Sequence, residues 1–208
     1  MFMQKTMPMN ILGRDITFFN QRSAEWTHPY EYEGRGTMKS SGCGIFALCH
    51  CAQWLTGKVP NAEELADFAV QFGGRGDDGT DRPLLLHTLM EHNRAAELGF
   101  RYEEDGLLND RELLFNFLKE ERGVSMANIR VGHIVTFVAA REINGEKQLL
   151  VIDSHSESVD PRVIHGVRES LPATLLTWQE EAGVRQSCAA FWVSLSLARD
   201  FNLLHRID

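Results

Sequence analysis

The sequence predicts an α+β fold in which the helices come first and the strands follow. Between residues 44 and 118, apolar side chains recur at helical spacing, and the segments begin at capping residues or end at glycine. From Val131 the apolar pattern changes to a period of two, and Asn144-Gly145 interrupts it as a hairpin turn does. Helices followed by strands, in place of a regular alternation, indicate an α+β protein and not a parallel α/β sheet.

The central element is expected to be a helix over 44–55. This run is apolar on nearly all of its faces and stops at Gly57, which is typical of a helix covered on every side. Residues 1–42 precede it as an irregular segment with one predicted strand, 16–19.

Three further helices are predicted. Asn61 caps the first, with Glu64 three residues later, and Gly73 ends it. The second spans about 83–98, and the third begins at Asn109 with Glu112 as its capping partner. The residues expected to face inward are Leu65, Phe68, Ala69 and Phe72 in the first helix and Leu113, Leu114, Phe117 and Leu118 in the third.

Strands are predicted over 131–140, 148–153 and 191–197, and the first two form the hairpin. A two-residue turn at Asn144-Gly145 would pair Val135 with Ser154 and point Asp153 away from His133. A three-residue loop over 143–145 would pair Val135 with Asp153, on the His133 face. Bringing His133 and Asp153 together therefore requires the odd loop or a bulge elsewhere in the pair.

Composition indicates one soluble domain spanning 1–208. A hydrophobic share of 43% and a charged share of 24% are those of a globular protein. The net charge of −8 argues against nucleic-acid binding and favours a neutral or cationic substrate. Neither a signal peptide nor an apolar run of the roughly 20 residues that cross a bilayer is recognisable. We expect a cytoplasmic protein without membrane or nucleic-acid partners.

The four cysteines, Cys43, Cys49, Cys51 and Cys188, do not form the spaced framework of a small secreted domain. We expect free thiols in a reducing compartment. Cys49-His50-Cys51 lacks the spacing of zinc ligands, and its side chains fan out over different helix faces. No metal or cofactor is therefore predicted.

Cys43 stands directly ahead of the apolar helix, between two glycines, where a nucleophilic thiol works best. A helix N-terminus supplies partial positive charge and free N–H groups, which lower a thiol's pKa. Downstream, His133 opens one strand and Asp153 closes another, in the chain order of papain-like cysteine enzymes. The alternative is structural: a buried cysteine and a strand-end histidine that only pack.

Three blocks of sequence resemble the papain-like cysteine peptidases related to the double-glycine leader peptidases that trim bacteriocin precursors. The blocks are Phe19-Asn20-Gln21 with Trp26, Ser40-Ser41-Gly42-Cys43-Gly44 with a helix ending at Gly57-Lys58, and Gly132-His133 through Asp153. They extend from about residue 16 to 155, and the C-terminal quarter carries no such signature.

The resemblance implies a papain-like fold, in which the cysteine-bearing helix packs on an antiparallel sheet, and a thiol hydrolase acting on a peptide or protein. Cys43 would be the nucleophile, His133 the general base, Asp153 its orienting partner, and Gln21 an oxyanion donor. From the residues alone, Gln21 would be an exposed polar loop residue. Many relatives have Pro-Thr after the Cys-Gly pair and Pro after the acid, where this chain has Ile45-Phe46 and Ser154.

Three functions are compatible with these residues. The first is hydrolysis of an amide by a cysteine peptidase or amidase through an acyl-thioester. The second is acyl transfer by the same triad to an amine, as in a transglutaminase. The third is a catalytically silent papain-like module that binds a partner. Residues 73–82 and 160–183 are expected to form the walls of the cleft.

Overall fold

The computed structural model describes residues 5–129, 133–154, 163–164, 167–168 and 190–207. The helices are α1 (Met38–Ser41), α2 (Cys43–Thr56), α3 (Ala62–Gln71), α4 (Arg82–Glu91), α5 (Arg94–Glu97), α6 (Arg111–Lys119) and the 3-10 turn η1 (Leu195–Leu197). The strands are β1 (Thr6–Ile11), β2 (Arg14–Phe19), β3 (Pro29–Tyr32), β4 (Arg35–Thr37), β5 (Arg75–Gly76), β6 (Gly79–Thr80), β7 (Phe100–Arg101), β8 (Gly123–Asn128), β9 (Ile134–Ile143), β10 (Glu146–Ile152), β11 (Val163–Ile164), β12 (Val167–Arg168), β13 (Ala190–Ser194) and β14 (Phe201–Arg206).

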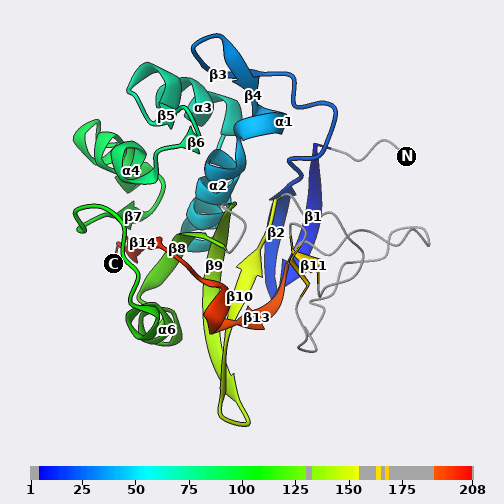
Figure 1. Ribbon diagram of the computed structural model, residues 1–208, viewed down its shortest axis with the longest axis vertical. Coiled ribbons are helices and arrows are strands. Elements are labelled where there is room, and N and C mark those ends of the chain that lie inside the picture. Colours follow the sequence, from blue (N-terminus) through cyan, green and yellow to red (C-terminus); the bar gives the residue numbers. More distant parts are fainter. Residues whose placement is uncertain (1–4, 130–132, 155–162, 165–166, 169–189, 208) are drawn as a thin grey trace.

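A six-stranded antiparallel sheet organises the fold, in the order β13-β10-β9-β8-β14-β7. The core on one face contains α2 and the β1–β2 hairpin, and the core on the other contains α6 and η1. Figure 1 shows α2 between α3 and the sheet. The predicted α+β class is confirmed.

Helix α2 forms where the sequence predicts it. Its residues from Gly44 to Trp54 are buried, and it packs against β2, β8 and β9. Gly57 adopts the left-handed conformation at φ 72° and donates its N–H to the Gln53 carbonyl. An uncharged, apolar helix of this kind is stable because other elements cover all of its sides.

The predicted helix over 83–98 is wrong as one element, because it is divided into α4 and α5. Asn93 lies between them with φ 56°, in the left-handed region that asparagine tolerates better than most residues. The N–H groups of His92 and Asn93 bond back to the carbonyls of Thr88 and Met90. The chain therefore closes α4 before it starts α5.

Helix α6 begins one residue later than predicted. Its cap is Asp110, not Asn109, and the Asp110 carboxylate accepts the N–H groups of Glu112 and Leu113. Leu113 was expected to face inward but is 38% exposed, whereas Phe115 is buried. Leu114, Phe117 and Leu118 are buried as predicted.

Several strands were not predicted. Strand β8 is buried at nearly every position, so it lacks the alternation that identifies a half-buried strand. Strand β14 likewise has consecutive buried residues, and β1 contains Pro8, which weakens a strand prediction. The predicted strand over 191–197 is divided into β13 and η1.

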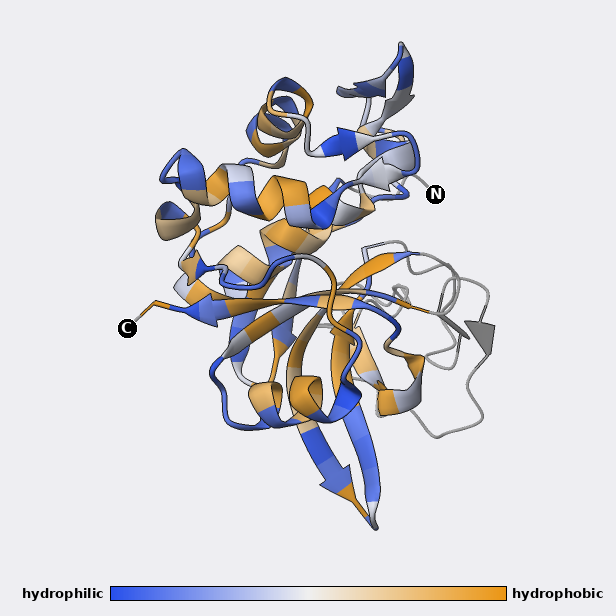
Figure 2. Ribbon diagram, turned by 60° about the vertical axis from the view of Figure 1, so that its left-hand side comes forward, coloured by the Kyte–Doolittle hydropathy of each residue, from blue (hydrophilic) through white to orange (hydrophobic). Residues whose placement is uncertain are grey.

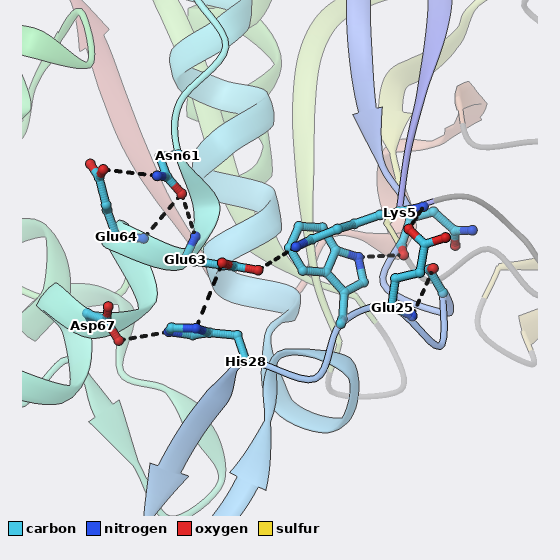
Figure 3. A network of polar contacts seen from close by, with 10 residues as sticks. Lys5, Glu25, His28, Asn61, Glu63, Glu64 and Asp67 are labelled. Atoms are coloured by element: carbon cyan, nitrogen blue, oxygen red, sulfur yellow. Dashed lines mark hydrogen bonds and ion pairs between the residues drawn. The ribbon is translucent and has the colours of Figure 1, made fainter.

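Polar contacts fix the N-terminal segments to α3 (Figure 3). The Lys5 ammonium pairs with Glu63 and lies 4.1 Å from the centre of the Trp26 ring. His28 Nε2 lies 2.8 Å from an Asp67 carboxylate oxygen. The predicted Asn61 cap is confirmed: its side chain accepts the N–H groups of Glu63 and Glu64. These contacts hold the chain that leads from β2 to the first turn of α2.

Candidate active site

Cys43 is the first residue of α2 and is partly exposed. The short helix α1 ends at Gly42, whose N–H bonds to the Met38 carbonyl, so the chain turns sharply into α2. A Cβ atom at Gly42 would lie 2.4 Å from that carbonyl oxygen, and one at Gly44 would lie 2.4 Å from Thr80. Both glycines are therefore required by close packing around the thiol.

His133 and Asp153 lie together beneath the thiol. His133 Nε2 is 2.7 Å from Asp153 Oδ1, and the two side chains are 3% and 0% exposed. A hydrogen bond links the His133 ring to the Cys43 side chain. Because Nε2 faces Asp153, the other ring nitrogen is the one available to the sulfur.

The β9–β10 register explains how His133 and Asp153 meet. Ile143 pairs with Glu146, so the turn is the two-residue Asn144-Gly145 form, with φ of 53° and 79°. Leu150 pairs with Ala139 but Val151 pairs with Phe137, which leaves Val138 as a bulge. Beyond this bulge, Asp153 comes opposite Val135 and on the His133 side. Either the odd loop or a bulge could bring His133 and Asp153 together, and the structure has the bulge.

The surroundings of Cys43 and His133 favour an ion pair, in which the proton that the two side chains share resides on the histidine. Burial would raise the pKa of Cys43, but the hydrogen bond and positive charge of His133, with N–H groups of Ile134 and Gly44, lower the pKa below its ordinary value. Burial would lower the pKa of His133, but the charge and hydrogen bond of Asp153 raise it to about 10. Both shifts favour a thiolate beside an imidazolium.

Gln21 lies next to these residues and is 3% exposed, so it is not the exposed loop residue that its local sequence suggests. Its backbone N–H donates to the Ser154 carbonyl at 2.9 Å. Its side-chain Nε2 donates to the Lys39 carbonyl at 3.1 Å, and its Oε1 accepts from the Ser154 hydroxyl at 3.3 Å. These two contacts set the orientation of the carboxamide and leave one Nε2 hydrogen for another acceptor.

Cys43 opens onto a cleft of about 520 Å³. Its walls come from the residues between β5 and α4, together with Leu107, Asn128 and Ile134. The predicted wall over 73–82 is thus confirmed for 76–82. The predicted wall over 160–183 lies almost entirely outside the described residues, and so does Cys188. Asp77, Asp78 and Asp81 line the cleft. Arg82 also lines it, but its charge is paired with Asp200.

Thr80 lines the cleft with Cys43 and contacts Tyr30, and no local sequence pattern predicts a role for either residue. Thr80 packs against Gly44, and its hydroxyl lies 2.7 Å from the Tyr30 hydroxyl. Tyr30 is fully buried, and burial raises its pKa, so it stays neutral. Its position is fixed further by Arg75, whose Nε donates to the Tyr30 carbonyl at 3.0 Å.

The other described thiols of α2 have a different environment. Cys49 and Cys51 are free and fully buried, and burial raises both pKa values, that of Cys51 to about 12. Burial lowers the pKa of His50 to about 3. Within the described ranges no group of three or more His, Cys, Asp or Glu side chains is arranged to hold a metal ion.

No protein-family model matches this chain, and no curated protein matches it either. In the described part of the chain, no helix has the length and apolar composition needed to span a bilayer.

Proposed function

We propose that the chain is a papain-like cysteine peptidase or amidase that cleaves a peptide or protein through an acyl-thioester on Cys43. One observation carries the proposal: a partly exposed thiol at the start of a buried helix is hydrogen-bonded to a histidine that a buried carboxylate holds at 2.7 Å. Nucleophile, base and orienting acid in this arrangement are the parts that covalent acyl chemistry needs.

In the acylation step, the Cys43 thiolate attacks the carbonyl carbon of the substrate amide, and the carbonyl π electrons move to oxygen. The Gln21 carboxamide and the backbone N–H of Cys43 donate hydrogen bonds to that oxygen. When the intermediate collapses, the C–N bond breaks and the amine takes a proton from the His133 imidazolium. The products are a free amine, neutral His133 and an acyl-thioester.

In the deacylation step, His133 takes a proton from water as the water oxygen bonds to the thioester carbon. The C–S bond then breaks, which releases the carboxylic acid and restores the thiolate beside the imidazolium. Asp153 accepts a hydrogen bond from the ring throughout, so it keeps the ring aligned and stabilises its charged form.

The arrangement of elements supports the papain-like assignment. A cysteine-bearing helix packs on an antiparallel sheet, and His133 and Asp153 stand at the ends of adjacent strands of that sheet. Gln21 follows the strand that packs against the same helix. These are the positions that the resemblance to the double-glycine peptidase group assigns to the four residues.

The cleft also supports a substrate class. Three aspartates line it, and its one lining cation, among the residues described, is paired with Asp200. Its potential therefore favours a positively charged side chain near the scissile bond, as the net charge of the chain also suggests. Leu107 and Ile134 add apolar surface to the same cleft.

The test is turnover of a peptide library by the wild type and by Cys43→Ala, with product masses measured in the presence and absence of added amine. We expect hydrolysed products from the wild type and none from Cys43→Ala, with unchanged circular dichroism. Full activity of Cys43→Ala would exclude the mechanism.

Two other outcomes identify the alternatives. Products that carry the added amine would show acyl transfer. Absence of turnover, with a partner bound equally by wild type and Cys43→Ala, would show a binding module.

A further inference from the structure

A buried ion pair lies beside the thiol site. Arg82 is 3% exposed, and its Nη2 pairs with Asp200 Oδ1. Its Nη1 donates to the carbonyls of Met126 at 2.9 Å and of Asp200 at 3.3 Å. The guanidinium thus joins the start of α4, which borders the cleft, to β8 and to the segment before β14.

Asn128 is tied into the same pair. Its Nδ2 donates to Asp200 Oδ1 at 2.9 Å, and its backbone N–H donates to the Asp200 carbonyl at 2.8 Å. Its carbonyl accepts the N–H of Arg199 at 3.0 Å. Asn128 is therefore held by three hydrogen bonds, two of them to one residue.

Asn128 is the last residue of β8, where the chain leaves the sheet, and the chain re-enters the sheet at Ile134, which pairs with Asn128. The N–H of Ile129 donates to the carbonyl of His133 at 3.0 Å. His133 bonds to the thiol through its ring, and Ile134 through its backbone N–H. Ile134 is thus paired with Asn128, the residue that Asp200 holds, and His133 is bonded to Ile129, the next residue in the chain.

We infer that Arg82, Asp200 and Asn128 form a positioning network for the cysteine site, which holds His133 and the Ile134 N–H against the Cys43 sulfur. The inference rests on the proposed function, because it assigns the network a role in keeping Cys43 ionised. A buried ion pair is weak evidence for a stabilising role, since desolvation offsets its attraction. The ion pair contributes a fixed geometry to the site, because the strength of a hydrogen bond to a thiolate depends strongly on distance and angle.

The test is the pH dependence of Cys43 alkylation by iodoacetamide, with the modified peptide quantified by mass spectrometry. In Arg82→Met we expect the inflection of the rate to move up by about one pH unit, because the thiolate loses part of its hydrogen bonding. At pH values below the wild-type inflection the rate then falls about tenfold. Arg82→Lys, which keeps the charge but loses the two-pronged contact, should give a smaller shift in the same direction.

Two controls separate this role from general destabilisation. Arg111→Met removes a surface arginine whose Nε donates to the Ala198 carbonyl at 2.7 Å, in the segment between η1 and β14 that also contains Asp200. The inflection of the alkylation rate in this variant should match that of the wild type. Asn128→Ala keeps the ion pair and the backbone hydrogen bonds but loses the side-chain bond to Asp200 Oδ1, and its inflection should move in the same direction as in Arg82→Met. If Arg82→Met does not fold, Asn128→Ala decides the question.

The failures are distinguishable. A wild-type inflection in folded Arg82→Met, or in Asn128→Ala, would overturn the positioning role while leaving the nucleophile assignment intact. A wild-type Cys43 that is not labelled preferentially would overturn the proposed function itself.

Discussion

The first turn of α2 and its middle carry the same chemical groups in opposite states. In the first turn the surroundings favour an ionised Cys43 beside a charged His133, whereas about two turns later burial favours protonated Cys49 and Cys51 and a neutral His50. Cys43 is partly exposed and Cys49 and Cys51 are fully buried, yet burial acts in the same direction at all three thiols, because it raises the pKa of each. Burial therefore cannot be what activates the thiol.

What differs is the set of partners. Cys43 has free N–H groups at the helix start and an imidazolium held by Asp153. Cys51 has one weak contact, 3.8 Å from its sulfur to the Thr136 hydroxyl, and His50 accepts the N–H of Phe19 at 3.1 Å and stacks on Phe18. A low dielectric amplifies whichever interaction is present, so it favours charge where an opposite charge is fixed and neutrality elsewhere.

The largest expected difference is in alkylation. At pH 7 we expect iodoacetamide to label Cys43 at least about 10³-fold faster than Cys49 or Cys51, because only Cys43 is largely thiolate. Peptide mapping after a short pulse measures the three rates. In urea the three rates should converge, and equal rates in the folded protein would contradict the nucleophile assignment.

Oxyanion stabilisation is the next effect in size. Gln21→Ala should lower kcat by about 10² to 10³, the usual loss for one oxyanion donor, with little change in KM. Steady-state kinetics on any cleaved peptide measures it. Alkylation of Cys43 develops no oxyanion, so its rate should stay at the wild-type level; a parallel fall in that rate would mean that Gln21 supports the fold of the site instead.

His50, in the middle of α2, should make the free energy of unfolding depend on pH in the acidic range. The unfolded His50 binds a proton below its ordinary pKa of 6.5, whereas the folded one does so only near pH 3, so the stability that neutral His50 contributes is lost as pH falls through this window. Between pH 7 and 5 we expect a loss of about 2 kcal/mol, a factor of about 30 in the folding equilibrium. Urea unfolding at the two pH values measures it.

The matched control for that measurement is a second histidine. His50→Gln should remove this part of the pH dependence, while His87→Gln, at a side chain that is 45% exposed, should leave it unchanged. An unaltered slope in His50→Gln would show that other groups cause the acid sensitivity.

The smallest expected effect concerns the charge on Asp153. Asp153→Asn retains a hydrogen-bonding group but not the negative charge, so the His133 pKa falls and the Cys43 pKa rises. At pH values below the wild-type inflection we expect about a tenfold slower alkylation of Cys43, with the rate recovered at higher pH. A profile identical to that of the wild type would mean that Asp153 only orients the ring.

Much of the site could be predicted from sequence because each member stands at an element boundary. Cys43 precedes an apolar helix, and His133 and Asp153 flank two strands of period two. Their meeting could not be predicted, because it depends on the bulge at Val138. Val138 and Ala139 both contribute to the core on the α2 face, and that packing is tertiary.

Other features of the fold could not be predicted from the sequence, for related reasons. Strand β8 is buried on both sides, so its sequence shows no period of two. Arg82 is separated from its partner Asp200 by 118 residues, and nothing in its local sequence distinguishes it from a surface arginine. Gln21 is buried because the end of β10 covers it, which its neighbours in sequence do not reveal.

The bulge at Val138 also divides the β9–β10 hairpin into two parts with separate tasks. The part next to the sheet presents His133 and Asp153, while the outer part, from Arg141 to Gln148, is largely exposed and polar and extends away from the core (Figure 2). Because the register is reset between them, the outer arm can be lengthened or shortened by whole residue pairs without rotating the inner strands. Asn144-Gly145 is thus a natural attachment point for a fluorophore or an inserted peptide tag, far from the candidate site.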